Sequence, residues 1–361
     1  MFKWFFPKSN RLMNKIVAFF LLFSTVANAQ IGGYVPFGFL NNYSNARIAA
    51  LGGSAIATLD NDASLVINNP SLLTANMDKQ LTLNYQNYLA DIGSGYFGYS
   101  FNSKKAGPLM LGVQYINYGA FDGKDINNIN TGSPAANEFA MHLTTSRIMN
   151  KWNIGATAKF VYSVLDVYSS VGMAADVGAS YKSEDSLSVF TAVINNLGYQ
   201  ITSFTGADRQ MYPMNFQIGY SKKFAHNPLR ISIIAHDLQK IGGLLYQNET
   251  KNNRNIDLST GLPIQEDFTS INYLMSHLII NTELLFGQGF HLRFGYNDLR
   301  RRELTIPDSR SWAGFSWGFG LKVRKYMFSY GSASLYSGNA TNHFSIIANL
   351  QEFYKKKNSD E

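Results

Sequence analysis

The residues from Trp152 to Val164 alternate strictly between two kinds of side chain. The aromatic and aliphatic set comprises Trp152, Ile154, Ala156, Ala158, Phe160, Tyr162 and Val164. The other, mostly polar or small, set comprises Asn153, Gly155, Thr157, Lys159, Val161 and Ser163. Alternation with period two places the two sets on opposite faces of a β-strand. At roughly 3.3 Å per residue this strand is long enough, when tilted, to cross the roughly 25 to 30 Å apolar core of a bilayer.

The same period returns along most of the chain and predicts about fourteen strands. They are expected near residues 80–89, 94–102, 108–118, 136–149, 151–165, 170–182, 186–197, 213–224, 228–238, 274–286, 289–300, 312–323, 325–336 and 341–350. An even number of long amphipathic strands is typical of outer-membrane barrels. We therefore predict an all-β fold, a transmembrane antiparallel β-barrel of about 14 strands over residues 80–350.

The connections between the predicted strands alternate in length. Short turns are expected near residues 102–107, 150, 183–185, 225–227, 287–288 and 324–325. The long connections, at 119–135, 198–212, 239–273 and 301–311, all fall on the opposite side. Bacterial barrels have short periplasmic turns and longer external loops. The long connections are therefore predicted to be external, and the mature N-terminus and the charged tail 351–361 to be periplasmic.

The polar face of the predicted strands carries little charge. A soluble β-sandwich also alternates, but its outward face is normally rich in charged residues. Here charged residues make up 15% of the chain, against roughly 25% in ordinary soluble domains. Small residues on the inner face are expected to leave room in a crowded lumen. The glycines on this face are Gly155, Gly172, Gly178, Gly219, Gly295, Gly318 and Gly320.

The N-terminus has the pattern of a secretory signal peptide. Basic residues precede the apolar run 16–23, and Ala27-Asn28-Ala29 ends it in small residues. A single membrane anchor is the alternative, but the run is too short for it. We predict that residues 1–29 are removed before Gln30, which lowers the formal net charge of +7. No concentrated basic face remains that would predict nucleic-acid binding.

Residues 30–79 differ in kind from the strands. Short apolar pieces there are interrupted by Gly, Asp, Asn and Pro, a pattern that predicts brief helices and turns. Between a signal peptide and a barrel, such a segment is expected to fold into the lumen as a hatch or plug. A periplasmic lead-in is the alternative. The residues singled out for the hatch are Arg47, Gly52, Gly53, Asp60, Asn68, Asn69 and Pro70.

Candidate catalytic and metal-binding residues are few. Cysteine is absent, which excludes thiolate sites and disulfides. His142 and His236 lack the spacing that would gather three metal ligands. His343 and Ser345 share one strand face, as in an outer-membrane lipase, but that face should point into the lumen and no orienting acid accompanies them. We predict no enzymatic activity, no metal and no cofactor.

A basic cluster lies on the predicted external side. It comprises Arg300, Arg301, Arg302 and Arg310. Guanidinium groups pair with phosphates through charge-assisted hydrogen bonds, so the cluster could contact lipopolysaccharide. A solvated loop rim is an equal alternative.

Several motifs resemble known outer-membrane families. Ala46 to Gly53, Asp60-Asn61-Asp62 and Asn68 to Leu73 are similar to the N-terminal hatch of FadL-like outer-membrane proteins. Other motifs, spread in order over nearly the whole mature chain, resemble outer-membrane barrels of the type IX secretion system of Bacteroidota. They are Leu83-Asn84-Tyr85 through Ile92, Gln114 to Gly119 with Phe121 to Gly123, Phe224 to His226, Ala235 to Gln239, Leu292 to Asn297 and Ser334 to Ser345. The connection from Gln239 to Tyr273 matches least.

The resemblance implies a non-enzymatic barrel in the complex that attaches secreted cargo to the cell surface. Its implied partners are the PorU sortase, the barrel PorV and a PorZ-like surface protein. We expect the partner contact on the long external loops, because the opposite rim has too little chain for an interface of about 800 Å² per side. The rival expectation, from the FadL-like motifs, is a channel for a hydrophobic solute.

Overall fold

The computed structural model describes the chain in ten stretches. They are residues 36–88, 92–120, 123–124, 130–132, 135–204, 212–240, 270–287, 289–304, 312–336 and 339–354. The predicted signal peptide, Arg310 and the end of the charged tail lie outside the described residues.

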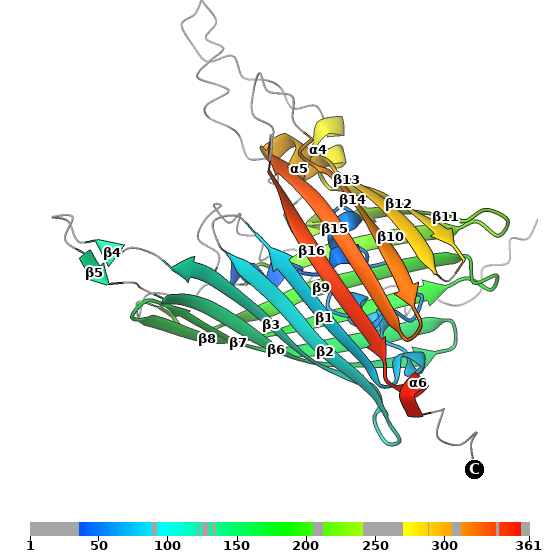
Figure 1. The fold of residues 1–361 in the computed structure, drawn as a ribbon, viewed down its shortest axis with the longest axis horizontal. Helices are drawn as coiled ribbons and strands as arrows, with labels where there is room; N and C mark the ends of the chain where they lie inside the picture. Colours follow the sequence, from blue (N-terminus) through cyan, green and yellow to red (C-terminus); the bar gives the residue numbers. More distant parts are fainter. Residues whose placement is uncertain are drawn as a thin grey trace, which may run out of the picture. The chain divides into compact units, whose positions relative to one another are not determined.

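Fourteen antiparallel strands close into one barrel (Figure 1). The closing pair is β1 with β16, which brings the two ends of the barrel sequence side by side. A separate two-stranded sheet, β4 (Gly123–Lys124) and β5 (Asn130–Gly132), lies between β3 and β6 in the sequence. The barrel strands are β1 (Gln80–Asn87), β2 (Gly93–Ser103), β3 (Gly107–Ala120), β6 (Ala135–Met149), β7 (Trp152–Leu165), β8 (Tyr168–Lys182), β9 (Ser188–Thr202), β10 (Asn215–Lys223), β11 (Leu229–Ala235), β12 (Leu278–Phe286), β13 (Phe290–Asn297), β14 (Phe315–Val323), β15 (Tyr326–Tyr336) and β16 (Asn339–Asn349). The predicted fold class is confirmed.

The two faces of each strand are inverted relative to those of a soluble protein. In β7, Trp152 and Phe160 are exposed on the outer face, whereas Thr157 and Lys159 are each 3% exposed on the inner face. The described strands as a whole present large apolar side chains outward and polar or small side chains inward. An outward apolar band around a polar interior is the arrangement of an outer-membrane barrel.

Helices among the described residues are short. None of them is both long enough and apolar enough to span a bilayer.

Connections alternate in length around the barrel as predicted. The rim with the connections 104–106, 150–151, 183–187, 224–228, 287–289 and 324–325 is called the short-turn rim. The opposite, long-connection rim carries 121–134, 203–214, 236–277 and 298–314, together with the short connections 88–92, 166–167 and 337–338. β1 begins and β16 ends at the short-turn rim.

Several predicted strand ends at the long-connection rim are wrong. β11 stops at Ala235, because Asp237 adopts a left-handed backbone conformation with φ 53°. The first residues of the predicted strand 274–286 belong to the helix α4 (Ser270–Ser276). β13 leads directly into the helix α5 (Asp298–Leu304). Asn297 marks this change, since its side chain accepts a hydrogen bond from the backbone N–H of Arg300 at 3.1 Å.

β9 is longer than predicted. Asn195-Asn196 followed by Gly198 resembles a turn signal, but the ladder continues to Thr202. Asn196 takes a left-handed conformation with φ 59°, and the register with β8 shifts beside it. A bulge absorbs the irregular residues without ending the strand.

Residues 36–79, here called the lumen segment, form short helices and turns. Its elements are η1 (Gly38–Asn41), α2 (Ala46–Ala50), η2 (Ala63–Leu65), η3 (Pro70–Leu72) and η4 (Ala75–Met77). Asn45, Asp62 and Asn69 precede α2, η2 and η3, and each side chain accepts a backbone N–H of the following turn. Such caps explain why these polar residues interrupt the apolar pieces.

The main hydrophobic core lies inside the barrel. Ile48, Leu65, Leu72 and Leu73 of the lumen segment are fully buried and pack in one cluster, which Tyr96 and Met110 of the wall complete. Burying one such aliphatic side chain contributes about 1.5 to 3 kcal/mol. The lumen segment therefore supplies the apolar core that the polar inner wall lacks.

Candidate functional site

Polar contacts tie the lumen segment to the wall in every direction. Hydrogen bonds or ion pairs join it to β1, β2, β3, β6, β7, β8, β9, β10, β11, β12, β13, β14 and β16. β15 contacts it by close approach, since a Cβ placed on Gly331 would lie 2.1 Å from the carbonyl oxygen of Ala46. The segment is thus attached around the whole circumference of the barrel.

Glycines on the inner wall admit the backbone of the lumen segment. A Cβ on Gly155 would lie 2.3 Å from the backbone of Pro70, and one on Gly295 would lie 2.2 Å from the backbone nitrogen of Gly52. Both distances are shorter than any van der Waals contact, so only glycine fits there. The predicted use of small inner residues is confirmed at these positions.

Arg47 is the centre of an ionic cluster in which the arginines and Glu283 are buried and Asp60 is partly exposed. Its guanidinium group is 2.7 Å from Asp60, 2.8 Å from Asp62 and 2.8 Å from Glu283. Asp60 and Asp62 belong to the lumen segment, and Glu283 projects inward from β12. The arginine therefore joins the lumen segment both to itself and to the wall.

Two further arginines complete the cluster from the wall. Arg230 of β11 lies 2.8 Å from Glu283 and 3.0 Å from Asp60. Arg293 of β13 lies 3.2 Å from Glu283 and donates to the hydroxyl of Ser329 at 3.2 Å. Three guanidinium groups thus balance three carboxylates, as buried charges require. Arg230 is the second residue of β11, so the cluster lies toward the short-turn rim.

The surroundings keep the cluster charged. Burial by itself would raise the pKa of Asp60, but Arg47 and Arg230 more than offset burial and lower that pKa. Burial would lower the pKa of Arg47, but Asp60 and Glu283 outweigh it and hold that pKa well above its usual value.

The predicted hatch residues Gly52 and Gly53 form the turn after α2. Their φ angles are 83° and 98°, a conformation that favours glycine. The backbone N–H of Gly52 donates to Ser316 of β14 at 2.9 Å, and its carbonyl accepts from Asn297 of β13 at 3.0 Å. The two glycines therefore let the backbone of the lumen segment dock against two strands.

Asn68, Asn69 and Pro70 anchor the opposite side of the lumen segment. The side chain of Asn68 accepts the backbone N–H of Ala55 at 2.8 Å. Asn69 donates to Thr191 of β9 at 2.8 Å. Pro70 is the first residue of η3, where its missing N–H costs nothing.

A second buried ion pair lies between β7 and β8. Lys159 is 2.8 Å from Asp176, and both side chains are 1% exposed. Lys159 also donates to Asn196, whose amide donates to Asn41 of the lumen segment at 2.8 Å. The cluster of Phe37, Phe39, Leu40 and Tyr212 with wall residues packs in the same part of the barrel.

The sequence did not identify Glu283, Arg230, Arg293, Lys159 or Asp176 as site residues. The available signal was charge on the inner face of strands that are otherwise poor in charge. Which of these charges meet depends on barrel closure and register, which no local pattern contains.

The predicted basic cluster is divided in the structure. A Cβ placed on Gly53 would lie 2.5 Å from the guanidinium group of Arg300, so Arg300 reaches the lumen segment. Arg302 donates to Asp298 at 2.5 Å and to Asn272 at 3.3 Å. Cβ of Arg301 lies beside Gly314, and Arg310 is outside the described residues. Contact with lipopolysaccharide stays a prediction.

His343 and Ser345 both point into the lumen and are buried. The Ser345 hydroxyl donates to Asn84 at 2.6 Å and accepts the backbone N–H of Ala46 at 2.8 Å. His343 lies 3.1 Å from the hydroxyl of Thr341. The contact with Ala46 ties the lumen segment to β16, and the other two lie within the barrel wall. Within the described part of the chain, no three His, Asp or Glu side chains are grouped so that they could hold a metal ion.

Comparison with known proteins gives likenesses of fold. The TodX monoaromatic hydrocarbon channel, as a deltaS2 mutant, matches with TM-score 0.48 and 14% identity over 86% of this chain and 97% of its own. The CymD monoaromatic hydrocarbon channel matches with TM-score 0.47 and 12% identity over 85% and 97% of the two chains. A FadL homologue of Pseudomonas aeruginosa matches with TM-score 0.45 and 10% identity over 85% and 98%. At these scores the likenesses carry no functional conclusion.

No protein-family model matches the sequence, and no curated protein matches it significantly.

Proposed function

We propose that this chain is a non-enzymatic outer-membrane barrel that serves as a surface anchor in type IX secretion, in the manner of PorQ. In this role it holds a PorZ-like surface protein in the cargo attachment complex beside PorU and PorV. The structural observation that carries the proposal is the lumen segment, which is attached to the wall around the whole barrel. The sequence motifs shared with type IX barrels supply the identity of the partners.

A permanently filled lumen suits an anchor better than a conduit. To open the barrel, the lumen segment would have to withdraw Arg47 from Glu283 and Asp60 from Arg230, whereas the pairs of Glu283 with Arg230 and Arg293 lie within the wall. Removing one partner from a buried ion pair typically costs about 3 to 5 kcal/mol. The hydrogen bonds to the other strands add to that cost. An anchor needs none of these contacts to break.

The long-connection rim is the side proposed for the partner. Its connections include residues 203–214, 236–277 and 298–314, whereas the short-turn rim has no connection longer than 183–187 or 224–228. A stable interface takes about 800 Å² from each partner. Only the long connections have enough chain to supply it.

A pull-down from mildly solubilised outer membranes tests the anchor. The tagged full-length barrel is compared with a variant whose residues 241–269 are replaced by a short linker, and with a control that shortens 125–129 instead. We expect the PorZ-like protein to purify with the wild type and the control and to be lost from the first variant. If the barrel purifies alone in all three cases, the anchor role is wrong.

The rival function is a channel for a hydrophobic solute. The observation that favours it is a buried apolar cluster in the lumen that includes Phe37, Phe39 and Tyr212 and offers the kind of surface such a solute would contact. Conductance across a planar bilayer separates the two functions. The anchor predicts a silent wild type and a conducting variant without residues 36–79. Loss of uptake of one nutrient in a deletion strain, with secretion intact, would favour the channel.

A further inference from the structure

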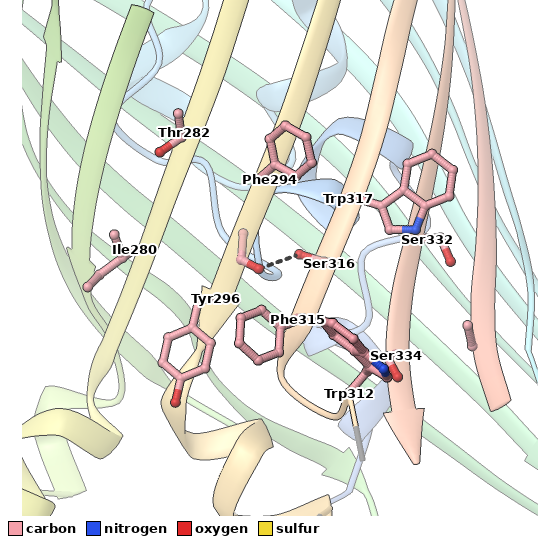
Figure 2. Close-up of a pocket in the computed structure, with 12 residues that line it drawn as sticks. Ile280, Thr282, Phe294, Tyr296, Trp312, Phe315, Ser316, Trp317, Ser332 and Ser334 are labelled. Carbon is pink, nitrogen blue, oxygen red and sulfur yellow. Dashed lines mark hydrogen bonds between the residues drawn. The ribbon is translucent and has the colours of Figure 1, made fainter. Parts of the chain in front are cut away.

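The outward face of the barrel wall contains a pocket near the long-connection rim (Figure 2). It extends across β12 to β16 and has a volume of about 680 Å³. This volume falls in the range of roughly 300 to 1,000 Å³ that is usual for small-molecule sites. Most of the lining side chains, among them Phe294, Tyr296 and Trp317, project from the lipid-facing side of the strands. Ser316 is an exception, because its hydroxyl contacts the lumen segment.

Aromatic rings form the walls of the pocket. Phe294 of β13 pairs with Trp317 of β14, and Tyr296 pairs with Phe315 one step closer to the rim. The rings of Tyr296 and Phe315 are 4.9 Å apart, and Trp312 lies edge-on to Phe315 at 5.8 Å. Figure 2 shows these rings around the opening. Aromatic belts of this kind mark the depth of the lipid headgroups in a barrel.

Small residues form the floor. The outward side of β15 carries Tyr326 and Phe328 near the short-turn rim but changes to Ser332 and Ser334 near the long-connection rim. Ala340 of β16 lies opposite Ser334. Ser332 is only 8% exposed although it faces outward, because the neighbouring side chains rise above it. The change from aromatic to small residues creates the hollow.

Two basic residues of α5, Arg301 and Arg302, neighbour residues of the pocket wall. The hydroxyl of Tyr296, a wall residue, donates to Asp298 at 2.9 Å, and Asp298 accepts from Arg302 at 2.5 Å. Cβ of Arg301 would be 2.8 Å from a Cβ on Gly314, the residue before Phe315. Arg302 is therefore linked to the aromatic wall through Asp298, and Arg301 starts beside the residue that precedes Phe315.

We propose that this pocket binds an acyl chain of a phosphorylated glycolipid of the outer leaflet, with the glycolipid phosphate at Arg301 and Arg302. The pocket opens toward the bilayer, so its occupant comes from the membrane. An apolar hollow with two arginines beside its rim-side wall matches the order of acyl chain and phosphate in such a lipid. A zwitterionic phospholipid would also fill the hollow, but it offers a single phosphodiester beside its own ammonium group, a weaker partner for two guanidinium groups than the phosphates of lipid A. This site is independent of the anchor role.

A lipid-retention experiment tests the pocket. Purified full-length barrel in detergent is incubated with radiolabelled diphosphoryl lipid A and an excess of phosphatidylethanolamine, and then passed through a sizing column. The pocket is filled by the double substitution Ser332→Leu and Ser334→Leu. Leucine is an apolar residue that fits the lipid-facing surface of a barrel. Heat-dependent migration on a gel checks that the variant is folded. The control is Ala156→Leu with Ala158→Leu on the outward face of β7, away from the pocket.

The wild type and the control should each retain lipid A above phosphatidylethanolamine. The filled variant should retain at least about tenfold less, the change in affinity that corresponds to about 1.4 kcal/mol. Equal retention by the filled variant and the wild type would mean that only boundary lipid is present and would overturn the proposal. Loss of a co-purifying membrane protein from the filled variant, with lipid retention unchanged, would assign the hollow to a protein interface and would also overturn it.

A second arm tests the phosphate. Arg301→Ala with Arg302→Ala should weaken retention of diphosphoryl lipid A and leave retention of its dephosphorylated form unchanged. Inorganic phosphate alone, added as a competitor, should not displace the lipid, because it lacks the acyl chain. If dephosphorylated lipid is lost equally, or if inorganic phosphate displaces the lipid, the proposed division between acyl pocket and phosphate contact is wrong.

Discussion

Arg47 and Glu283 each have three ionic partners, more than any other residue described in the lumen. Arg47 is the one that belongs to the lumen segment. It contacts two carboxylates of its own segment and one of the wall, at distances from 2.7 to 2.8 Å. Neighbouring guanidinium groups of Arg230 and Arg293 share Glu283 with it. The buried charges of Arg47, Arg230, Arg293 and Glu283 are stable in the interior because they pair with one another and with Asp60 and Asp62. The consequences of single substitutions follow from this dependence.

Replacement of Arg47 by methionine should strongly destabilise the barrel. Asp62 loses its ion pair, and Asp60 and Glu283 each lose one of their guanidinium partners. We expect the free energy of unfolding to fall by about 3 to 5 kcal/mol, measured by urea titration in lipid vesicles. Lys151→Met is the control, since Lys151 pairs with Glu184 on the surface and such pairs contribute at most about 1 kcal/mol. If Arg47→Met and Lys151→Met lowered the free energy of unfolding equally, the result would contradict the structure.

We expect Asp60 to make the free energy of unfolding depend on pH in the acidic range but not near neutral pH. Its pKa is lowered in the folded protein, so its carboxylate stabilises the fold above the unfolded pKa of about 3.9. This contribution is lost only as the pH falls through the lower, folded pKa. The stability difference between wild type and Asp60→Asn should therefore be constant from about pH 8 to pH 5 and shrink below about pH 4. A difference that already disappears near pH 6 would show that Asp60 is not held by the arginines.

At the level of elements, the strands and the lumen segment fit together through glycine. Gly155 and Gly295 leave no space for a side chain because the backbone of the lumen segment occupies it. Gly172 and Gly320 make room instead for the wide side chains of Tyr212 and Arg293. Close packing between wall and segment makes the position of each glycine specific.

Gly295→Val should displace the lumen segment without unfolding the strands. Its Cβ would lie 2.2 Å from the nitrogen of Gly52 and 2.4 Å from the backbone carbon of Leu51, so the turn after α2 must move. We expect faster tryptic cleavage within residues 36–79 while the barrel still migrates as a folded species. Gly289→Val is the control, because nothing lies within 4 Å of its Cβ position. Similar cleavage rates for wild type and Gly295→Val would mean that the segment is not packed there.

The whole molecule is polarised between its two rims. Long connections gather at one rim and short turns at the other. The ionic cluster lies toward the short-turn rim, and the aromatic pocket and α5 lie toward the long-connection rim. The proposed barrel anchor is consistent with this division, since the ionic cluster ties the lumen segment toward one rim and the other rim carries the long connections.

Cysteine labelling tests which rim is outside. The sequence contains no cysteine, so single substitutions report without background. Val167, in a connection of the long-connection rim, is 80% exposed, and His226, in a connection of the short-turn rim, is also exposed. In intact cells a membrane-impermeant maleimide should label Val167→Cys and should reach His226→Cys only after the outer membrane is permeabilised. The reverse pattern would invert the proposed orientation.

Much of the architecture is encoded locally in the sequence. The period-two alternation from Trp152 to Val164 assigns each side chain to one face, and the structure has the same assignment. The number of strands and the alternation of connection lengths follow from the same local pattern. Asn45, Asp62 and Asn69 likewise start their turns through contacts with residues two or three positions away. These features needed no knowledge of distant residues.

Only the tertiary structure decided which distant residues meet. Arg47 and Glu283 are 236 positions apart, and their contact depends on the closure of β1 onto β16 and on the register of every strand between them. The outer pocket also exists only because register aligns the aromatic residues of β13 and β14 beside the serines of β15. The helices α4 and α5 replaced predicted strand ends because packing at the rim, rather than side-chain alternation, determines the backbone there. Alternation encodes the face of a residue, but its partner is set by closure and register, which are properties of the whole barrel.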